Sequence, residues 1–487
     1  MMMHRITFVW IGSAVAAIAL AGPLAIAADA PDRLLQAGAA MSNITPPLGE
    51  PIVGGWESPP ATHIHDELNA RCLVLDDGET TLAIVLCDNV GISRDILDAA
   101  RALAEEATGI PGDHMLIAST HTHSATPARG MDRLATSGEL TGYPKFLAGR
   151  IADGIARAAR NRESARIGWG SVDVPGQVFN RRWFLKPETV LPNPFGGTDR
   201  VKMNPRRGDP DLLEPAGPTD PEVSILSVQS ADGRPIALLA NYSLHYVGGV
   251  PAGHVSADYF GVFASRIQEL LGADGQDPPF VGILSNGTSG DVNNIDFRSP
   301  GERLAPYEKM RAVADEVAVA VSRAHLGIAF RDWVPLGAAT RELTLAARVP
   351  NAEQIAYARE ILDRPADAKP YHSHERIYAE RVLRAAEGPV SVSILLQTLR
   401  IGDLGIAAIP FEVFAESGLE IKQRSPFNDS FTIELANGSY GYLPTPRQHE
   451  LGGYETWLGT NRVEIQASEK IEDVIIDLFG ELKRSFP

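Results

Sequence analysis

Met115-Leu116-Ile117-Ala118 is an apolar run that ends in the polar stretch Thr120-His121-Thr122-His123-Ser124. A short apolar run of this kind is typical of a buried strand. Side chains two residues apart on a strand point to the same face, so we expect His121 and His123 to point the same way from the end of a rigid element. Neutral imidazoles placed in this way are suited to bind a metal ion, although a hydrogen-bonded polar pair without a metal is an alternative.

Two further candidate residues also follow apolar runs. His245 comes after the run 236–240, and Glu412 comes just past the run 406–409. Active sites gather at strand ends because the strand fixes the residue while the loop keeps it accessible. Taken alone, His245 also fits a core histidine bonded to a backbone carbonyl, and Glu412 also fits an acid that the dipole of a helix N-terminus favours.

Later stretches add phenols and a polar loop. Tyr442 lies in the stretch 437–445, and Tyr454 follows it. A phenol near a divalent cation loses its proton more easily, and it can ligate the ion or donate to a developing oxyanion. The loop 285–294 follows another buried strand, and its Asp291 is a candidate to orient a metal-bound histidine. Packed aromatic rings and a plain polar turn are the structural alternatives.

Strand and helix patterns alternate along the chain, with several hairpins among them. We therefore predict an α/β fold with mixed β-sheets flanked by helices, in a single large catalytic domain over residues 28–487. Residues 183–220 hold many Pro, Gly and Asp and predict a long surface loop. Residues 352–386 are charged and helical in pattern, which predicts a helical insertion or lid. This segment contains His372-Ser373-His374, a weaker metal candidate, because residues two apart do not share a helix face.

The first 27 residues differ in composition from the rest. They contain Arg5, an apolar run over 8–21 and the small-x-small sequence Ala25-Ile26-Ala27, which together predict a secretory signal peptide. We therefore expect a secreted or periplasmic protein. A transmembrane anchor is the alternative, but the apolar core is short and Gly22-Pro23 interrupts its end.

Charge and cysteine content exclude some classes of function. The chain of 487 residues has a formal net charge of −17, which repels phosphate backbones, so we expect no nucleic-acid partner. Its two cysteines, Cys72 and Cys87, flank a predicted hairpin. A turn centred on Asp77-Gly78 places Cys72 near Ala83, so we expect two buried thiols rather than a disulfide. Gly-rich phosphate loops and a Gly-x-Ser-x-Gly elbow are absent.

Taken together, motifs spread over the chain resemble the neutral/alkaline (non-lysosomal) ceramidase family. The resemblance is sharpest at Thr120-His121-Thr122-His123-Ser124, and Tyr442 and Tyr454 keep the twelve-residue spacing of the family's tyrosines. The other matching stretches are Ile44-Thr45-Pro46-Pro47, Gly54-Gly55-Trp56, Ile64-His65-Asp66, Ala70-Arg71-Cys72-Leu73-Val74-Leu75, Asn180-Arg181 and Gly290-Asp291-Val292.

The resemblance implies a zinc amidase that cleaves ceramide, or a related N-acyl substrate, by attack of a zinc-bound water. It places the zinc ligands on His121, His245, Glu412 and Tyr442. It places His123, Arg181 and Tyr454 around the scissile amide. Three or four N or O ligands on one Zn²⁺ are suited to generate a nucleophile near neutral pH. His123 is then suited to protonate the leaving amine, and Arg181 or a tyrosine to stabilise the oxyanion.

Two departures from the family pattern affect the predicted substrate. Asn293 stands where the family has a serine, and a carboxamide is no nucleophile, although it can hydrogen-bond to a substrate. The chain also stops about one helix after Tyr454, where characterised family members carry an immunoglobulin-like domain. The expected partner is a small N-acyl lipid or a related molecule, with peripheral contact to a membrane surface. A metal-dependent esterase or other hydrolase acting on a non-lipid substrate, and an inactive binding homologue, are the alternatives.

Overall fold

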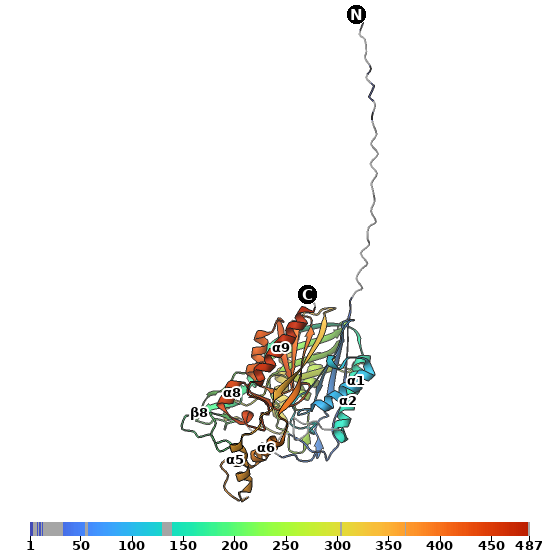
Figure 1. The fold of residues 1–487 in the computed structure, drawn as a ribbon. Coiled ribbons are helices and arrows are strands. Elements are labelled where there is room, and N and C mark those ends of the chain that lie inside the picture. Colours follow the sequence, from blue (N-terminus) through green and yellow to red (C-terminus); the bar gives the residue numbers. More distant parts are fainter. Residues whose placement is uncertain are drawn as a thin grey trace. The chain divides into compact units, whose positions relative to one another are not determined.

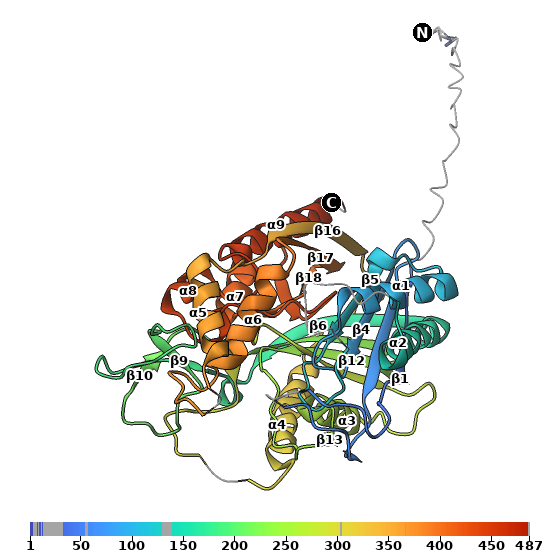
Figure 2. The same ribbon diagram turned by 60° about the horizontal axis from the view of Figure 1, so that its bottom comes forward.

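Two β-sheets packed face to face form the centre of the molecule (Figures 1 and 2). The computed structural model describes residues 33–53, 57–128, 139–301, 304–365 and 367–485, together with positions 1, 2, 7, 9, 10 and 12. The predicted signal peptide therefore lies almost entirely outside the described residues, as does Gly54-Gly55-Trp56. Within the described ranges, no helix has both the length and the apolar character needed to cross a bilayer.

The larger sheet has eight strands and mixed directions. Its order is β14 (Val281–Asn286), β12 (Pro235–Tyr242), β11 (Glu222–Ser230), β6 (Glu163–Asp173), β1 (Leu35–Asn43), β3 (Asn69–Asp76), β4 (Thr81–Cys87) and β5 (Met115–Ser119). Neighbours are antiparallel except at the two edges, where β12 pairs with β14 and β4 pairs with β5 in parallel. Mixed sheets are therefore confirmed.

The smaller sheet has four strands and again one parallel pair. Its order is β16 (Leu336–Ala346), β17 (Ser391–Ile401), β18 (Leu404–Ile409) and β20 (Asp429–Glu434), with β18 and β20 parallel. Leu399 and Phe431 of this sheet share one buried cluster with Leu73 and Leu226 of the larger sheet. The central core of the protein is therefore the space between the two sheets.

Helices cover the outer face of each sheet, which gives four layers (Figure 2). The larger sheet is covered by α1 (Arg94–Thr108), α2 (Gly142–Arg160), α3 (Asp258–Leu270) and α4 (Glu308–His325). The smaller sheet is covered by α7 (Ala415–Arg424) and α9 (Ala467–Arg484). Strands covered on both faces must be apolar on both faces, which explains why β3 and β4 read as continuous apolar runs. Helices flanking mixed sheets are as predicted.

The remaining elements are short and lie around one end of the sheets. Three two-residue pairs are β2 (His63–Ile64) with β13 (His254–Val255), β7 (Phe179–Asn180) with β15 (Val292–Asn293), and β19 (Glu412–Val413) with β21 (Tyr442–Leu443). The predicted loop over 183–220 instead contains three short strands, β8 (Arg182–Leu185), β9 (Val201–Met203) and β10 (Leu212–Pro215). Strands this short leave no recognisable alternation between their Pro- and Gly-rich turns, so the loop prediction was wrong there.

Residues 352–363 and 375–387 form the helical pair α5 (Ala352–Asp363) and α6 (Glu375–Glu387). Asn351 caps α5, and its side chain and that of Gln354 form a reciprocal capping box. Ala358 of α5 and Val382 of α6 pack with Leu458 from the main body. Figure 2 shows the two helices side by side, and α8 (Pro446–Leu451) is a separate short helix. Whether this pair moves as a lid stays a prediction.

The β3–β4 hairpin has a register different from the predicted one. Cys72 lies opposite Val85, not near Ala83, and Cys87 lies opposite Ala70. Asp77 causes the shift, because its carboxylate accepts hydrogen bonds from the backbone of Glu79 and Thr80 and so centres the turn one residue later. Both cysteines are buried free thiols, and burial raises the pKa of Cys72 to about 12.

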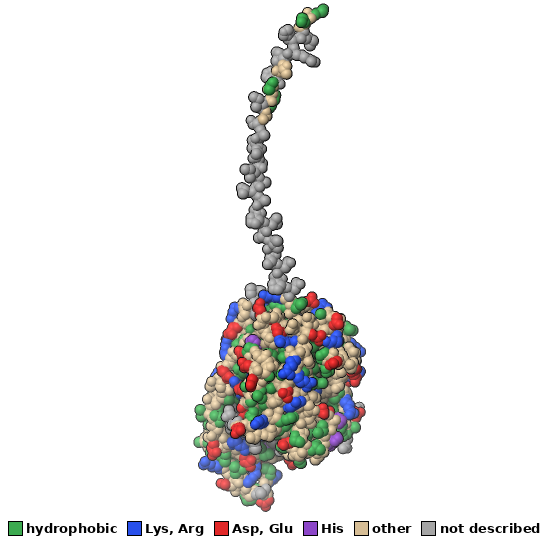
Figure 3. Space-filling view, turned by 90° about the vertical axis from the view of Figure 1, so that its right-hand side faces the viewer, with side chains coloured by type: hydrophobic (Ala, Val, Ile, Leu, Met, Phe, Trp, Pro, Cys, Tyr) green, Lys and Arg blue, Asp and Glu red, His purple; other side chains and the backbone are tan. Residues whose placement is uncertain are grey.

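Acidic and basic side chains are interspersed over the face shown in Figure 3. The structure also contains surface ion pairs, such as Arg166 with Asp332 and Arg266 with Asp315. The net negative charge is therefore not concentrated in one acidic region on that face.

Candidate metal centre

The predicted metal-binding residues follow strands of both sheets. β12 and β5 stand near opposite edges of the larger sheet, and the sheet curls so that β14, the neighbour of β12, contacts β5. His121 follows β5, and His245 follows β12. Ser289 follows β14, the parallel neighbour of β12, and Glu412 follows β18 of the smaller sheet. The fold thus brings together residues that are separated by up to three hundred positions in the sequence.

The backbone at His121 is left-handed, with φ of 73°. The strand β5 ends at Ser119, so His121 and His123 lie in the following loop, and the prediction that the strand pleat aligns them was wrong. A positive φ is uncommon for any residue with a side chain, and such residues gather at functional sites. The N–H of His121 donates to the carbonyl of Asn89, which helps to hold this conformation.

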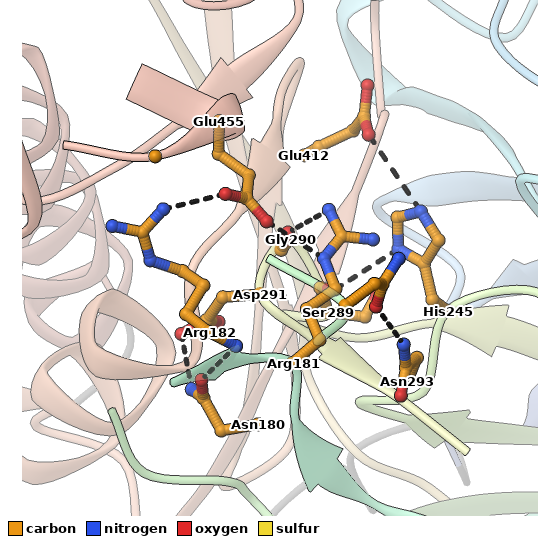
Figure 4. A network of polar contacts seen from close by, with 12 residues as sticks. Asn180, Arg181, Arg182, His245, Ser289, Gly290, Asp291, Asn293, Glu412 and Glu455 are labelled. Carbon is orange, nitrogen blue, oxygen red and sulfur yellow. Dashed lines mark hydrogen bonds and ion pairs between the residues drawn. The ribbon is translucent and has the colours of Figure 1, made fainter. Parts of the chain in front are cut away.

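Three imidazoles and one carboxylate converge after these strands. The Nε2 atom of His121 lies 3.0 Å from Nε2 of His245 and 3.1 Å from Nε2 of His123. The Oε2 atom of Glu412 lies 3.4 Å from Nε2 of His121 and 4.0 Å from Nε2 of His245. His121, His245 and Glu412 are buried, whereas His123 is half-buried. Figure 4 shows Glu412 directed at the His245 ring.

The contacts of the Nδ1 atoms of His121 and His245 show which ring nitrogen carries a proton. Nδ1 of His121 lies 2.6 Å from the carbonyl oxygen of Val90, and Nδ1 of His245 lies 3.1 Å from the carbonyl oxygen of Ser289. A carbonyl only accepts, so each Nδ1 carries a proton, and the neutral form of each ring presents a lone pair at Nε2. Two lone pairs facing each other at 3.0 Å repel, and a shared cation removes the repulsion.

The spacing of these atoms fits a small divalent metal ion. Bonds of about 2.0–2.1 Å to a tetrahedral Zn²⁺ place the ligand atoms about 3.3 Å apart, close to the separations found here. His121, His123 and His245 form a group whose ligand atoms can hold an ion. Burial, followed by the neighbouring His121 and Arg181, lowers the pKa of His245 well below its usual value. Its imidazole therefore stays neutral, which is the form that binds metals.

Ser289 and Glu434 hold the Nδ1 side of the His245 ring, opposite the Nε2 atom that faces His121. The hydroxyl oxygen of Ser289 lies 3.1 Å from Nδ1 of His245, and it donates to Oε1 of Glu434 at 2.7 Å. Glu434 also accepts the backbone N–H of Val413 at 2.7 Å. Burial raises the pKa of Glu434 well above its usual value. The sequence offered no indication of this residue, because Glu434 ends a short strand in which polar and apolar residues alternate.

Asp291 has a different role from the predicted one. Its Oδ2 accepts from the amide of Asn180 at 2.7 Å, and its Oδ1 accepts the N–H of Ala415, the first residue of α7, at 2.9 Å. Ser289, two residues earlier, makes the contact to His245. The prediction that Asp291 orients a metal-bound histidine was therefore wrong.

The buried carboxyl of Asp291 predicts a pH-dependent contribution to stability. Burial raises its pKa from 3.8 to about 6, so the folded protein binds this proton more tightly than the unfolded chain. The stability gained from the proton is complete below about pH 4 and is lost as the pH rises through about 6. We expect the urea midpoint of Asp291→Asn, measured relative to that of the wild type, to rise between pH 4 and pH 7. A difference that is constant with pH would contradict this, since altered contacts with Asn180 give only a constant offset.

Arg181 places a buried positive charge beside the histidines. Its Nε donates to Oε1 of Glu455 at 3.0 Å, and its Nη2 donates to the carbonyl of Gly290 at 2.8 Å (Figure 4). Its guanidinium lies 5.3 Å from the ring centre of Tyr442. Burial acts to lower the pKa of Arg181, but Tyr442 and Glu455 together raise it above its usual value. Arg181 therefore remains charged at any pH at which the protein is folded.

The two tyrosines join this group through Arg181. Tyr442 pairs with Glu412 in the short parallel ladder of β21 and β19, and its ring centre lies 5.8 Å from that of Tyr454. Burial raises the pKa of Tyr442 well above its usual value, so the phenol keeps its proton unless a cation is bound nearby. The role of Tyr442 as a metal ligand stays a prediction.

Asn293 hydrogen-bonds within the protein at both ends of its carboxamide. Its Nδ2 donates to Oδ1 of Asn204 at 2.8 Å, and its Oδ1 accepts the N–H of Ile295 at 3.0 Å. These bonds stabilise the loop after β15. Its predicted part in substrate binding stays a prediction.

Two pockets flank the candidate centre. The first has a volume of about 510 Å³ and is lined by His123, Tyr246 and His254, with Tyr246 stacked on the His123 ring at 3.7 Å. The second has a volume of about 490 Å³ and lies between Tyr454 and residues 371–374, which precede α6. His372 and His374 line this second pocket. In the part of the chain that the structure describes, no third metal-binding side chain joins them.

Comparison with solved structures identifies the fold. The neutral ceramidase from Pseudomonas aeruginosa matches with a TM-score of 0.68 at 16% sequence identity, over 94% of this chain and 75% of that chain. A ceramidase complexed with C2 matches equally, over 94% of this chain and 76% of that chain. Neither the protein-family models nor the curated proteins include a match. The chain thus has a fold similar to that of a bacterial neutral ceramidase, which confirms the resemblance drawn from the motifs.

Proposed function

We propose that the protein is a zinc-dependent hydrolase that cleaves an N-acyl amide bond. The observation that carries the proposal is the convergence of three Nε2 atoms and the Glu412 carboxylate in a buried site. The similarity to neutral ceramidase supports it, because that protein has the same fold. We further propose a small N-acyl lipid or a related molecule as the substrate, in line with the second matching structure, a ceramidase complexed with C2.

The residues of the site divide the work of amide hydrolysis among them. The histidines and Glu412 would hold a divalent cation, which would supply an activated water and polarise the substrate carbonyl. The carbonyl of Val90 and Ser289 fix the two buried imidazoles, so no reorganisation is needed during the reaction. Arg181 holds a permanent charge in a dry environment, where it stabilises negative charge on the amide oxygen.

His123 is the residue best placed to give a proton to the leaving amine. It is half-buried and lines the first pocket, whereas His121 and His245 are buried. Its Nε2 is also near enough to His121 to act as a third nitrogen ligand. The two pockets, one at His123 and one at Tyr454, offer separate space for the two parts of a substrate on either side of its scissile bond.

Metal analysis combined with a matched substrate panel tests the proposal. The purified protein is expected to contain about one zinc per chain and to hydrolyse a short fluorogenic N-acylsphingosine. A chelator should abolish the hydrolysis, and added Zn²⁺ should restore it. Undiminished hydrolysis by metal-free protein would contradict the proposal. Hydrolysis of only the corresponding O-acyl ester would indicate an esterase, and stoichiometric zinc without turnover would indicate a binding protein.

A further inference from the structure

Four arginines line one small cavity beside α6. They are Arg348, Arg381, Arg384 and Arg462, and the cavity has a volume of about 50 Å³. Arg348 follows β16, Arg381 and Arg384 lie on α6, and Arg462 belongs to the loop after Tyr454. No residue that lines the cavity is acidic. We call this cavity the arginine pocket.

The charge of Arg348 is not neutralised by a carboxylate in the described structure. Its Nη1 donates to two neutral acceptors, the carbonyl of Thr456 at 2.6 Å and Oδ1 of Asn461 at 3.0 Å. Burial lowers its pKa to about 10, and no anionic neighbour offsets the effect. Arg94 shows the usual arrangement in this protein, since it pairs with both Asp98 and Glu342. An anion in the pocket would remove the cost of burying an uncompensated cation.

The backbone around the pocket is shaped to bring these segments together. Gly459 has φ of 94°, and a Cβ at this position would lie 2.9 Å from Cβ of Arg381. The loop therefore approaches α6 closely only because residue 459 is glycine. The guanidinium of Arg381 lies 4.8 Å from the ring centre of Tyr378, which holds its stem against the helix. The pocket is thus a built feature of the fold rather than a chance meeting of mobile side chains.

We propose that the arginine pocket binds a small oxyanion of the phosphate class, either inorganic phosphate or the phosphate headgroup of a lipid. Guanidinium groups bind phosphate oxygens through paired, charge-assisted hydrogen bonds, which suits a site built from several arginines. The volume of about 50 Å³ exceeds the roughly 10–15 Å³ that a single water needs. The proposal does not depend on the reaction that the metal centre performs.

A bound anion would join α6 to the loop that follows Tyr454. Arg348 contacts Asn461, and the side-chain amide of Asn461 donates to the backbone carbonyl of Tyr442 at 3.1 Å. The pocket is therefore two hydrogen bonds from a residue of the candidate metal centre. Occupancy of the pocket is expected to stabilise this part of the structure as well as the protein as a whole.

Thermal unfolding of the full chain in sodium phosphate tests the proposal. Ionic strength is held constant with sodium chloride so that general screening does not change. We expect phosphate to raise Tm in a saturable manner. Arg384→Gln and Arg348→Gln should each weaken the apparent affinity at least about tenfold, as expected for loss of a charge-assisted hydrogen bond. Arg359→Gln is the matched control, because Arg359 is exposed on α5 and does not line the pocket.

Arg384 is the more informative of the two positions. It is exposed, and its side chain makes no hydrogen bond to another described residue, so we expect its replacement to leave the fold intact, which the Tm without phosphate checks. His121→Ala serves as a second control, and an unchanged phosphate effect in this variant places the anion outside the metal centre. A phosphate effect of full size in Arg384→Gln, or none in wild type together with no vesicle binding, would overturn the proposal.

Vesicles distinguish the two sources of the anion. Wild type is mixed with phosphatidylcholine vesicles that contain or lack phosphatidic acid, and bound protein is measured by flotation. Binding that requires phosphatidic acid and is lost in Arg384→Gln, but kept in Arg359→Gln, would assign the pocket to a lipid headgroup. A saturable phosphate effect without vesicle binding would assign it to the free anion.

Discussion

Replacement of His121 or His245 by alanine is expected to remove bound metal and amide hydrolysis together. Each variant takes away one of the two buried Nε2 atoms that face each other at 3.0 Å. Loss of the metal removes several kcal/mol of stabilisation of the transition state, which corresponds to a fall in kcat/KM of at least about a thousandfold. Metal content by elemental analysis and hydrolysis of an N-acyl substrate are measured on the same preparations.

Two further variants make this test specific. His114→Ala is the matched control, because His114 lies at the opposite end of β5, where its Nδ1 is 3.1 Å from the carbonyl oxygen of Thr81. It should keep both metal and activity. His123→Ala distinguishes the two roles open to His123: a proton donor keeps the metal and loses turnover, whereas a ligand loses both. Full metal content in both His121→Ala and His245→Ala would show that the ion, if any, binds elsewhere.

The second large effect is expected for Arg182→Met, which should destabilise the protein by about 3–5 kcal/mol. Arg182 is fully buried, and its Nη1 donates to Oε2 of Glu455 at 2.6 Å while its Nε donates to Oε1 of Gln448 at 3.0 Å. Glu455 is also fully buried, so removal of Arg182 leaves one oxygen of a buried carboxylate unpaired. Equilibrium unfolding in urea measures the change.

A surface arginine provides the comparison for Arg182. Arg94→Met breaks pairs with Asp98 and Glu342, but these groups are partly exposed, and exposed pairs contribute about 0–1 kcal/mol. Arg182→Met should also weaken catalysis, because Glu455 accepts from Arg181 through its other oxygen. Equal destabilisation by the two variants would show that the buried network has no special energetic role.

The sequence pattern was sufficient to predict the layers and the strand ends that carry the site. Apolar runs identified β5, β12 and β18, and the polar residues that follow them include His121, His245 and Glu412. β5 and β12 stand at opposite edges of the larger sheet and β18 lies in the smaller one, so the residues meet because the larger sheet curls and the two sheets stack, not because of any local motif. The resemblance of the motifs pointed to the same residues.

Other parts of the site depend on contacts between residues far apart in the sequence, which no local sequence pattern predicts. Ser289 and Glu434 are 145 residues apart, and they meet only because the two sheets stack. Arg182 and Glu455 are 273 residues apart. The left-handed backbone at His121 and the shifted β3–β4 turn each depend on a few specific hydrogen bonds, and residue type alone does not reveal them.

Cys72 and Cys87 are buried free thiols, so their reaction with a thiol reagent reports unfolding of the protein. Thiol reagents attack the thiolate, and burial suppresses that form in both residues. Helix α2 packs directly on Cys72: a Cβ added at Gly154 would lie 2.7 Å from the Sγ atom of Cys72. We therefore expect alkylation under native conditions to require opening of the core, so that at saturating reagent its rate equals the opening rate, without any engineered label.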